Sequence, residues 1–187
     1  MSTDKETLPS RTRKYVLFSV LAAVTVALDQ WTKILARAEL RPLGPGRTRT
    51  VIEGFFDLRY SENSGVAFGL LQTMPGGRIV LTAVAVAAFV LVLHYLRKTE
   101  DSQVRLHVAL GLVGGGAIGN LIDRIAYGRV TDFIVWHYRG TEWPAFNIAD
   151  AALVVGVGLM AIDMFRSGKA SEKDKETAGG RASGKDA

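Results

Sequence analysis

Two aspartates, Asp132 and Asp150, lie in stretches that are otherwise largely apolar, residues 130–136 and 146–155. A carboxylate at bilayer depth costs roughly 2.5 to 3.5 kcal/mol at a helix centre, so it tends to persist only where it is used or paired. Two aspartates that share one proton can hydrolyse a peptide bond: the ionised one activates a water and the protonated one polarises the carbonyl. The pair therefore indicates acid–base chemistry at a membrane.

The two carboxylates have unlike surroundings in the sequence. Asp132 is flanked by apolar and aromatic residues, and burial there favours its protonated form. Asp150 falls in the first turn of an expected helix, where the helix N-terminus favours negative charge and Asn147 is placed to cap. Simple anchoring of both side chains at the membrane interface remains an alternative on these residues alone.

Other catalytic groups are poorly represented. The chain has no cysteine, which excludes disulfides, thiol nucleophiles and cysteine-based zinc sites. The three histidines are too dispersed to form one site, and Ser64 has no histidine or lysine beside it. A third acid, Asp123, is next to Arg124 at the end of an apolar segment, which favours a structural ion pair or loop anchor over a catalytic role.

Four apolar segments must position these residues. They cover about 15–36, 79–96, 104–122 and 148–165, and each approaches the roughly 20 residues that a helix needs to cross the hydrocarbon core. The sequence therefore predicts an integral membrane, mainly α-helical protein with four transmembrane helices. A cleavable secretory signal is the alternative for the first segment, but the charges of Asp29 and Lys33 and the arginine in the cleavage-like tripeptide 36–38 argue against it.

Lysine and arginine predict the orientation. They are concentrated in the N-terminal segment 1–14, in the connection 97–105 and in the tail after residue 165, so these three regions are expected in the cytoplasm. The arginines of the long first loop are partly offset by acidic residues. Both termini are then cytoplasmic, and the polar residues Asp29, Lys33, Asn63, Asp132 and Asp150 converge on the extracytoplasmic face.

The connections and tail carry weaker signals. Residues 48–52 and 55–60 are β-branched and aromatic around a glycine, which predicts a short hairpin or small sheet. A glycine-bearing turn at 63–71 leads into an apolar stretch that could lie on the membrane surface. The tail 167–187 is rich in Lys, Glu, Gly and Ser and is expected to be disordered. The net charge of +5 indicates membrane topology and headgroup attraction rather than nucleic-acid binding.

Glycines are concentrated within the third apolar segment, at residues 114–119. The run lacks the Lys-Ser/Thr ending of a phosphate-binding loop, so close helix packing is the favoured interpretation. The same interpretation applies to Gly156 and Gly158 in the fourth segment.

Five short motifs together resemble one known family. They are DQWTK at 29–33, NSGVAF at 63–68, GNLIDR at 119–124, VTDF at 130–133 and FNIAD at 146–150. In order and spacing they are similar to the bacterial lipoprotein signal peptidases, also called signal peptidase II, over roughly residues 15–165. Any one motif would be weak evidence, whereas five in register are very specific.

The resemblance implies an aspartyl endopeptidase of the bacterial cytoplasmic (inner) membrane. It would remove the signal peptide from diacylglyceryl-modified prolipoproteins, cutting just before the lipidated cysteine, without a metal or cofactor. The implied fold is four transmembrane helices with a small extracytoplasmic β-sheet and a short amphipathic helix, acting as a monomer among membrane phospholipids. The implied catalytic dyad is Asp132 and Asp150, and the implied substrate-binding or supporting residues are Asn63, Gly65, Asn120, Asp123, Arg124, Asn147, Asp29 and Lys33.

Two other classes of protein remain to be separated from a peptidase. A proton-coupled transporter or channel would distribute acidic residues through the membrane depth, whereas here only Asp163 stands apart from the outer cluster. A noncatalytic scaffold would tolerate replacement of both aspartates by asparagine.

Overall fold

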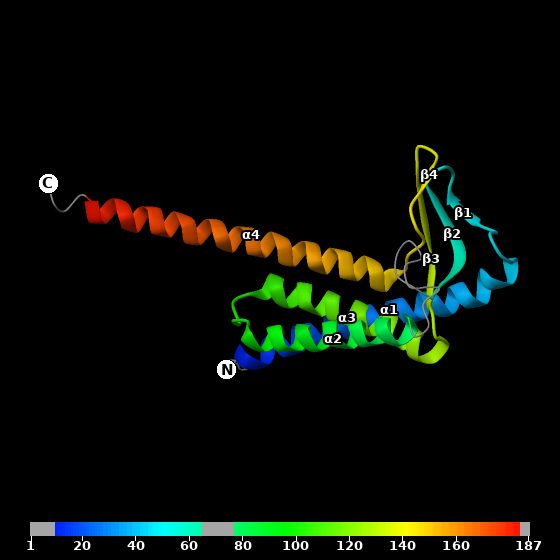
Figure 1. The fold of residues 1–187 in the computed structure, drawn as a ribbon, viewed down its shortest axis with the longest axis horizontal. Helices are drawn as coiled ribbons and strands as arrows, with labels where there is room; N and C mark the ends of the chain where they lie inside the picture. The colour runs from blue at the N-terminus through cyan, green and yellow to red at the C-terminus, as the bar shows by residue number, and fades with distance from the viewer. Residues whose placement is uncertain (1–9, 65–76, 184–187) are drawn as a thin grey trace, which may run out of the picture.

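The computed structural model describes residues 10–64 and 77–183, which form a helical bundle with a small sheet at one end (Figure 1). The long helices of this part of the chain are α1 (Ser10–Glu39), α2 (Gly77–Lys98), α3 (Val104–Tyr127) and α4 (Ile148–Ser183), and a short 3₁₀ helix, η1 (Arg41–Leu43), follows α1. The strands are β1 (Arg49–Ile52), β2 (Phe56–Asn63), β3 (Val130–Tyr138) and β4 (Thr141–Glu142), in the order β1-β2-β3-β4, and each neighbouring pair is antiparallel.

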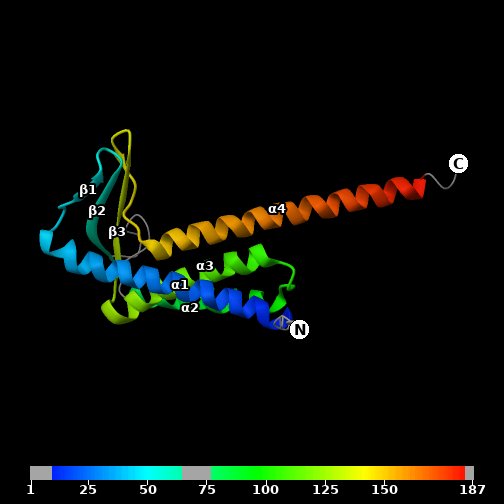
Figure 2. The ribbon, with the colours of Figure 1, turned by 180° about the vertical axis from the view of Figure 1, so that it is seen from behind.

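All four helices are long and apolar enough to cross a membrane, which confirms the predicted fold class. The stretches that qualify are Thr12–Leu43, Ile79–Lys98, Val104–Tyr127 and Ile148–Arg166. In α3 72% of the most apolar stretch is buried, against 17% to 22% in the other three. Helix α3 is therefore the centre of the bundle, with α1, α2 and α4 packed around it (Figure 2). The surrounding helices leave apolar side chains exposed on their outer faces.

Glycines let the helices approach closely around α3. A Cβ atom added to Gly115 would lie 2.8 Å from the Ala22 carbonyl oxygen of α1, and one added to Gly116 would lie 2.5 Å from the Ala149 carbonyl oxygen of α4. Gly156 of α4 has the same function against α3. The packing interpretation of these glycines is confirmed. It is wrong for Gly158, which has open space where a Cβ would be.

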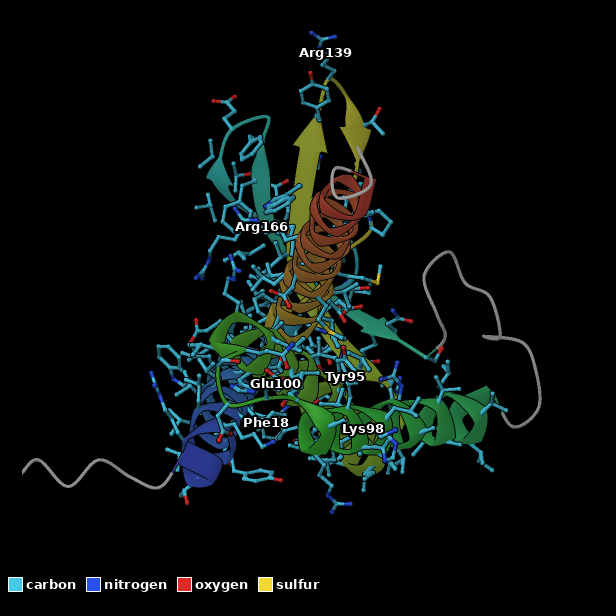
Figure 3. All side chains as sticks on the ribbon, turned by 90° about the vertical axis from the view of Figure 1, so that its left-hand side faces the viewer. Phe18, Tyr95, Lys98, Glu100, Arg139 and Arg166 are labelled. Atoms are coloured by element: carbon cyan, nitrogen blue, oxygen red, sulfur yellow. The ribbon has the colours of Figure 1, made fainter. Side chains whose placement is uncertain are left out.

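The end of α3 turns the chain into the sheet. Gly128 adopts a left-handed conformation, with φ 78°, and its N–H bonds to the Arg124 carbonyl, a common way to end a helix. Strand β3 then crosses the end of the bundle and pairs with β2. Figure 3 shows Arg139 at the outer tip of the β3–β4 hairpin, well away from the helices.

The structure differs from the sequence-based prediction in two regions, and a third predicted element lies outside the described residues. Residues 130–136, for which the sequence predicted no secondary structure, belong to strand β3, because the Val, Ile, Phe and Trp side chains there suit a sheet. The tail was expected to be disordered, whereas α4 continues to Ser183, since Ala, Lys and Glu favour a helix once it has started. The amphipathic helix of the first loop would fall in residues 65–76, outside the described residues.

Candidate active site

Strand β3 brings Asp132 to the start of α4. Asp132 lies opposite Ser61 of β2, and Val130 lies opposite Asn63. On its other side, β3 bonds to Phe146, two residues before the fourth helix: the N–H groups of Phe133 and Ile134 both donate to the Phe146 carbonyl. Residues 132 and 147 are thereby held beside each other, although 15 positions separate them in the sequence.

Asn147 and Asp150 cap the N-terminus of α4 reciprocally. The Asp150 N–H donates to Asn147 Oδ1 at 2.9 Å, and the Asn147 N–H approaches Asp150 Oδ2 at 3.4 Å. This is the reciprocal arrangement of a capping box, and it confirms the predicted capping role of Asn147. Asp29 of α1 adds a third interaction, accepting the Ala149 N–H at 2.9 Å. The local geometry fixes the backbone around Asp150.

Three asparagines bond to the two aspartates, and two of them, Asn147 and Asn120, connect one aspartate to the other. Nδ2 of Asn147 donates to Asp132 Oδ1 at 2.7 Å, and Nδ2 of Asn120 donates to Asp150 Oδ1 at 2.7 Å. Nδ2 of Asn63 donates to Asp132 Oδ2 at 3.2 Å, and Nδ2 of Asn147 also donates to Asn120 Oδ1 at 3.2 Å. The structure thus gathers five of the predicted residues, from four elements or their ends, into one hydrogen-bonded network.

A buried lysine determines how one of these amides points. Lys33, which is fully buried, donates to Asn120 Oδ1 at 3.0 Å and pairs with Asp29 at 2.9 Å and Asp123 at 3.5 Å. A lysine ammonium has donors only, so it holds the Asn120 oxygen toward itself. The Asn120 NH₂ group is then directed at Asp150.

Asp123 of α3 links helix α1 to the backbone of strand β3. Its Oδ1 pairs with Arg37 Nη2 at 2.6 Å, and its Oδ2 accepts the Thr131 N–H at 2.8 Å. The predicted anchoring role is therefore present, with Lys33 and Arg37 of α1 as its cations. Arg124 donates to the Asn120 carbonyl at 3.4 Å, one turn back along α3.

Burial changes the acidity of Asp132, which is only 2% exposed. It raises the pKa of Asp132 from 3.8 to about 7, chiefly because the charged form loses water and secondly because the negative charge of Asp150 is near. Hydrogen bonds from Asn63 and Asn147 and the charge of Lys33 oppose this rise. Asp132 can consequently hold a proton near neutral pH, as the sequence indicated.

Three residues that contact the site were not predicted from the sequence, and one predicted residue lies outside the described residues. Gln30, Arg37 and Thr131 contact the acidic cluster and were not singled out from the sequence. Arg37 follows Lys33 by four residues, as Lys33 follows Asp29, so helical spacing could have revealed it. Gly65 lies outside the described residues. In the part of the chain that the structure describes, no three His, Cys, Asp or Glu side chains are placed to hold a metal ion.

Comparison with known proteins identifies the family. A family model described as signal peptidase (SPase) II matches residues 21–166. The chain belongs to the signal peptidase II family. The lipoprotein signal peptidase of Symbiobacterium thermophilum is 45% identical over 80% of this chain and 94% of its own length, and that of Geobacter metallireducens is 39% identical over 86% and 97%.

Solved structures agree with this assignment. A structure described as a bacterial membrane enzyme matches 79% of this chain and 86% of its own, with a TM-score of 0.70 and 29% sequence identity. A second, with a TM-score of 0.69, matches 78% and 90%. As a signal peptidase II family member this protein is a peptidase, and its four apolar helices make it a multi-pass membrane protein.

Proposed function

We propose that this protein is an aspartyl endopeptidase of the bacterial inner membrane that removes the signal peptide from diacylglyceryl-modified prolipoproteins, cutting just before the lipidated cysteine. Asp132 and Asp150 form its catalytic dyad. The observation that supports this best is the asparagine network, in which Asn147 and Asn120 join the two carboxylates through bonds of 2.7 Å and 3.2 Å. Family membership supports the substrate class.

The dyad shares one proton. Protonated Asp132 transfers its proton to the scissile carbonyl oxygen, while ionised Asp150 takes a proton from a water whose oxygen attacks the carbonyl carbon. The resulting gem-diol collapses as the proton held by Asp150 passes to the leaving nitrogen, the C–N bond breaks and Asp132 regains its proton from the new carboxyl group. No metal, cofactor or covalent intermediate takes part. The two carboxylates titrate as a coupled pair.

The other polar residues of the five motifs have supporting roles in this scheme. Asn63 and Asn147 bond to Asp132 and orient it, Asn120 orients Asp150, and Arg124 and Gly65 belong to the substrate-facing surroundings that the motifs imply. Lys33 and Asp29 fix this arrangement from α1. The acyl chains of the substrate enter laterally, against the exposed apolar side chains of α2 and α4.

Both termini are cytoplasmic and the dyad is extracytoplasmic in this proposal. The start of α1 and the α2–α3 connection lie at the bundle end opposite the sheet (Figure 1), and these segments carry Arg13, Lys14, Arg97, Lys98 and Arg105. The protein acts as a monomer surrounded by phospholipid, and nucleic acid is not a partner.

The test is cleavage of a lipid-modified prolipoprotein in detergent. Asp132→Asn and Asp150→Asn should each lower kcat by at least about a thousandfold, because each removes one half of the acid–base pair. Asp163→Asn is the matched control, since Asp163 is also on α4 but pairs with Arg105 at 3.7 Å on the far side of the bundle from the site. It should stay within twofold of wild type.

Two outcomes would contradict the proposal. Turnover retained by Asp132→Asn or Asp150→Asn would exclude the dyad and favour a noncatalytic scaffold. Equal cleavage of a prolipoprotein that lacks the diacylglyceryl group would exclude the proposed selection for lipid-modified substrates.

A further inference from the structure

Thr131, the residue before Asp132, is held by three parts of the molecule at once. Its N–H donates to Asp123 Oδ2 of α3 at 2.8 Å, and its hydroxyl accepts from Arg37 Nε of α1 at 3.0 Å. Its carbonyl oxygen accepts from Asn147 Nδ2 at 3.3 Å. The residue is 2% exposed, and its bonds to Asp123 and Asn147 are buried away from bulk water. Every polar group of Thr131 is therefore fixed.

Arg37 provides the α1 side of this arrangement. While Nε bonds to Thr131, Nη2 pairs with Asp123 Oδ1 at 2.6 Å, and the guanidinium carbon lies 4.1 Å from the centre of the Tyr127 ring. A planar guanidinium can make these contacts together, whereas a lysine ammonium provides a single point of charge. Its side chain is 15% exposed, which leaves the ion pair largely protected from water.

These contacts converge on the backbone that carries Asp132. Asp123 receives Arg37 on one oxygen and the Thr131 N–H on the other, so the arginine both bonds to Thr131 directly and holds the carboxylate that bonds to it. Asn147 bonds to the Thr131 carbonyl and to the Asp132 carboxylate with the same NH₂ group. A shift of Thr131 would consequently be transmitted to the Asp132 side chain.

We propose that Arg37 and Thr131 are positioning residues that hold Asp132 in register with Asp150 for the peptidase reaction. This inference rests on the proposed function of the two aspartates. Neither residue touches the reacting atoms in this scheme, so each acts through the geometry of Asp132. Since displacement of a catalytic group by about 1 Å can cost about a hundredfold in rate, the loss is expected in kcat rather than in KM.

The test compares conservative variants of both residues in the lipid-modified prolipoprotein assay. Thr131→Val removes the hydroxyl and keeps the shape, Thr131→Ser keeps the hydroxyl, and Arg37→Met removes the guanidinium. Arg105→Met is the matched control, because Arg105 is also an arginine paired with an acid of another helix, Asp163, at 3.7 Å. Thermal unfolding is measured for each purified variant so that rates refer to folded protein.

Thr131→Val is expected to lower kcat about tenfold with KM within twofold, and Thr131→Ser to restore at least half of the wild-type kcat. Arg37→Met should lower kcat further, because two bonds to the Asp123 and Thr131 pair are lost. The double variant should be no slower than Arg37→Met alone, since both changes break the same bond. Arg105→Met should stay within twofold.

Failure of this inference is distinguishable from failure of the dyad. If Asp132→Asn abolishes cleavage but Thr131→Val keeps kcat within twofold, the positioning role is wrong and the dyad stands. Equal losses in Thr131→Val and Thr131→Ser, or a rise in KM at unchanged kcat, would also overturn it. Full activity of Asp132→Asn would remove the dyad and this role with it.

Discussion

Helix α1 buries one lysine toward each end of the bundle, and the two have different partners. Lys33, near the sheet, contacts Asp29, Asp123 and the carboxamide of Asn120, which in turn bonds to Asp150. Lys14, at the opposite end and 7% exposed, donates to the backbone carbonyls of Thr99 at 2.6 Å and Arg97 at 3.5 Å. One lysine is part of a side-chain network, whereas the other caps the end of α2.

The comparison shows that burial alone does not identify a functional charge. Both lysines are buried and both are satisfied, as buried ammonium groups must be. Lys14 meets the carbonyl end of a helix, where the dipole favours a cation, and nearby Thr99 is occupied with His107 at 3.0 Å. What separates the two ends is the kind of partner: Lys33 bonds to two carboxylates and to the carboxamide that contacts Asp150, whereas the hydrogen bonds of Lys14 go to backbone carbonyls.

Lys33→Met is expected to cause the largest loss in the free energy of unfolding. This change leaves the buried carboxylates Asp29 and Asp123 with less compensation, which should lower the free energy of unfolding by about 3–5 kcal/mol. It also frees the Asn120 amide, so the remaining folded protein should cleave substrate at least tenfold more slowly. Chemical unfolding in detergent and kcat per folded molecule measure the two losses.

Lys14→Met is the control for this prediction. It removes hydrogen bonds to backbone carbonyls at a helix end and should cost about 1 kcal/mol, with kcat within twofold of wild type. Comparable loss of kcat in both variants would show that the two ends are not functionally distinct.

A smaller effect concerns the dependence of stability on pH. The folded-state pKa of Asp132, about 7, lies above its ordinary value of 3.8, so the folded protein binds this proton more tightly than the unfolded chain. The associated stability is fully present below about pH 4 and is lost as the pH rises through 7. Asp132→Asn should remove this slope and be more stable than wild type above pH 7 by about 4 kcal/mol.

Thermal unfolding from pH 4.5 to 8 measures this difference. Asp163→Asn, toward the other end of α4, should keep the wild-type slope. A wild-type stability that is flat between pH 4.5 and 7 would contradict the raised pKa. The same proton predicts that kcat falls as the pH rises above about 7, because Asp132 loses its acid form.

The smallest effect is expected from glycine replacements. A Cβ at Gly119 would lie 2.5 Å from Asp29 Oδ2, so Gly119→Ala must displace a carboxylate that bonds to both Lys33 and the α4 N-terminus. We expect a loss of about 1–3 kcal/mol and a measurable fall in kcat. Gly158→Ala meets nothing within 4 Å and should change neither. Equal stability of the two variants would show that this close approach adapts at no cost.

Much of the site could be predicted because most of its residues lie within the five sequence motifs. The four spans, the β1–β2 hairpin and the capping role of Asn147 follow from hydrophobic length, β-branched residues and local hydrogen-bonding rules. Arg37 was missed because it lies outside the motif at 29–33, although it follows Lys33 by one helical turn. Strand β3 was missed because its apolar run, Val130–Trp136, also suits a membrane edge, and only pairing with β2 distinguishes the two.

The sequence by itself determined that this protein crosses a membrane four times, that it belongs with the signal peptidases and that its unusual acids are few. These properties are local, since they depend on composition, run length and short motifs. Only the tertiary structure decided which groups bond to which acid. Asp123 is held by α1 and holds Thr131, Lys33 orients Asn120, and Asn147 reaches Asp132. Such pairings span up to 120 positions along the chain, as between Asp29 and Ala149, and depend on how helices and strands meet, which no local pattern specifies.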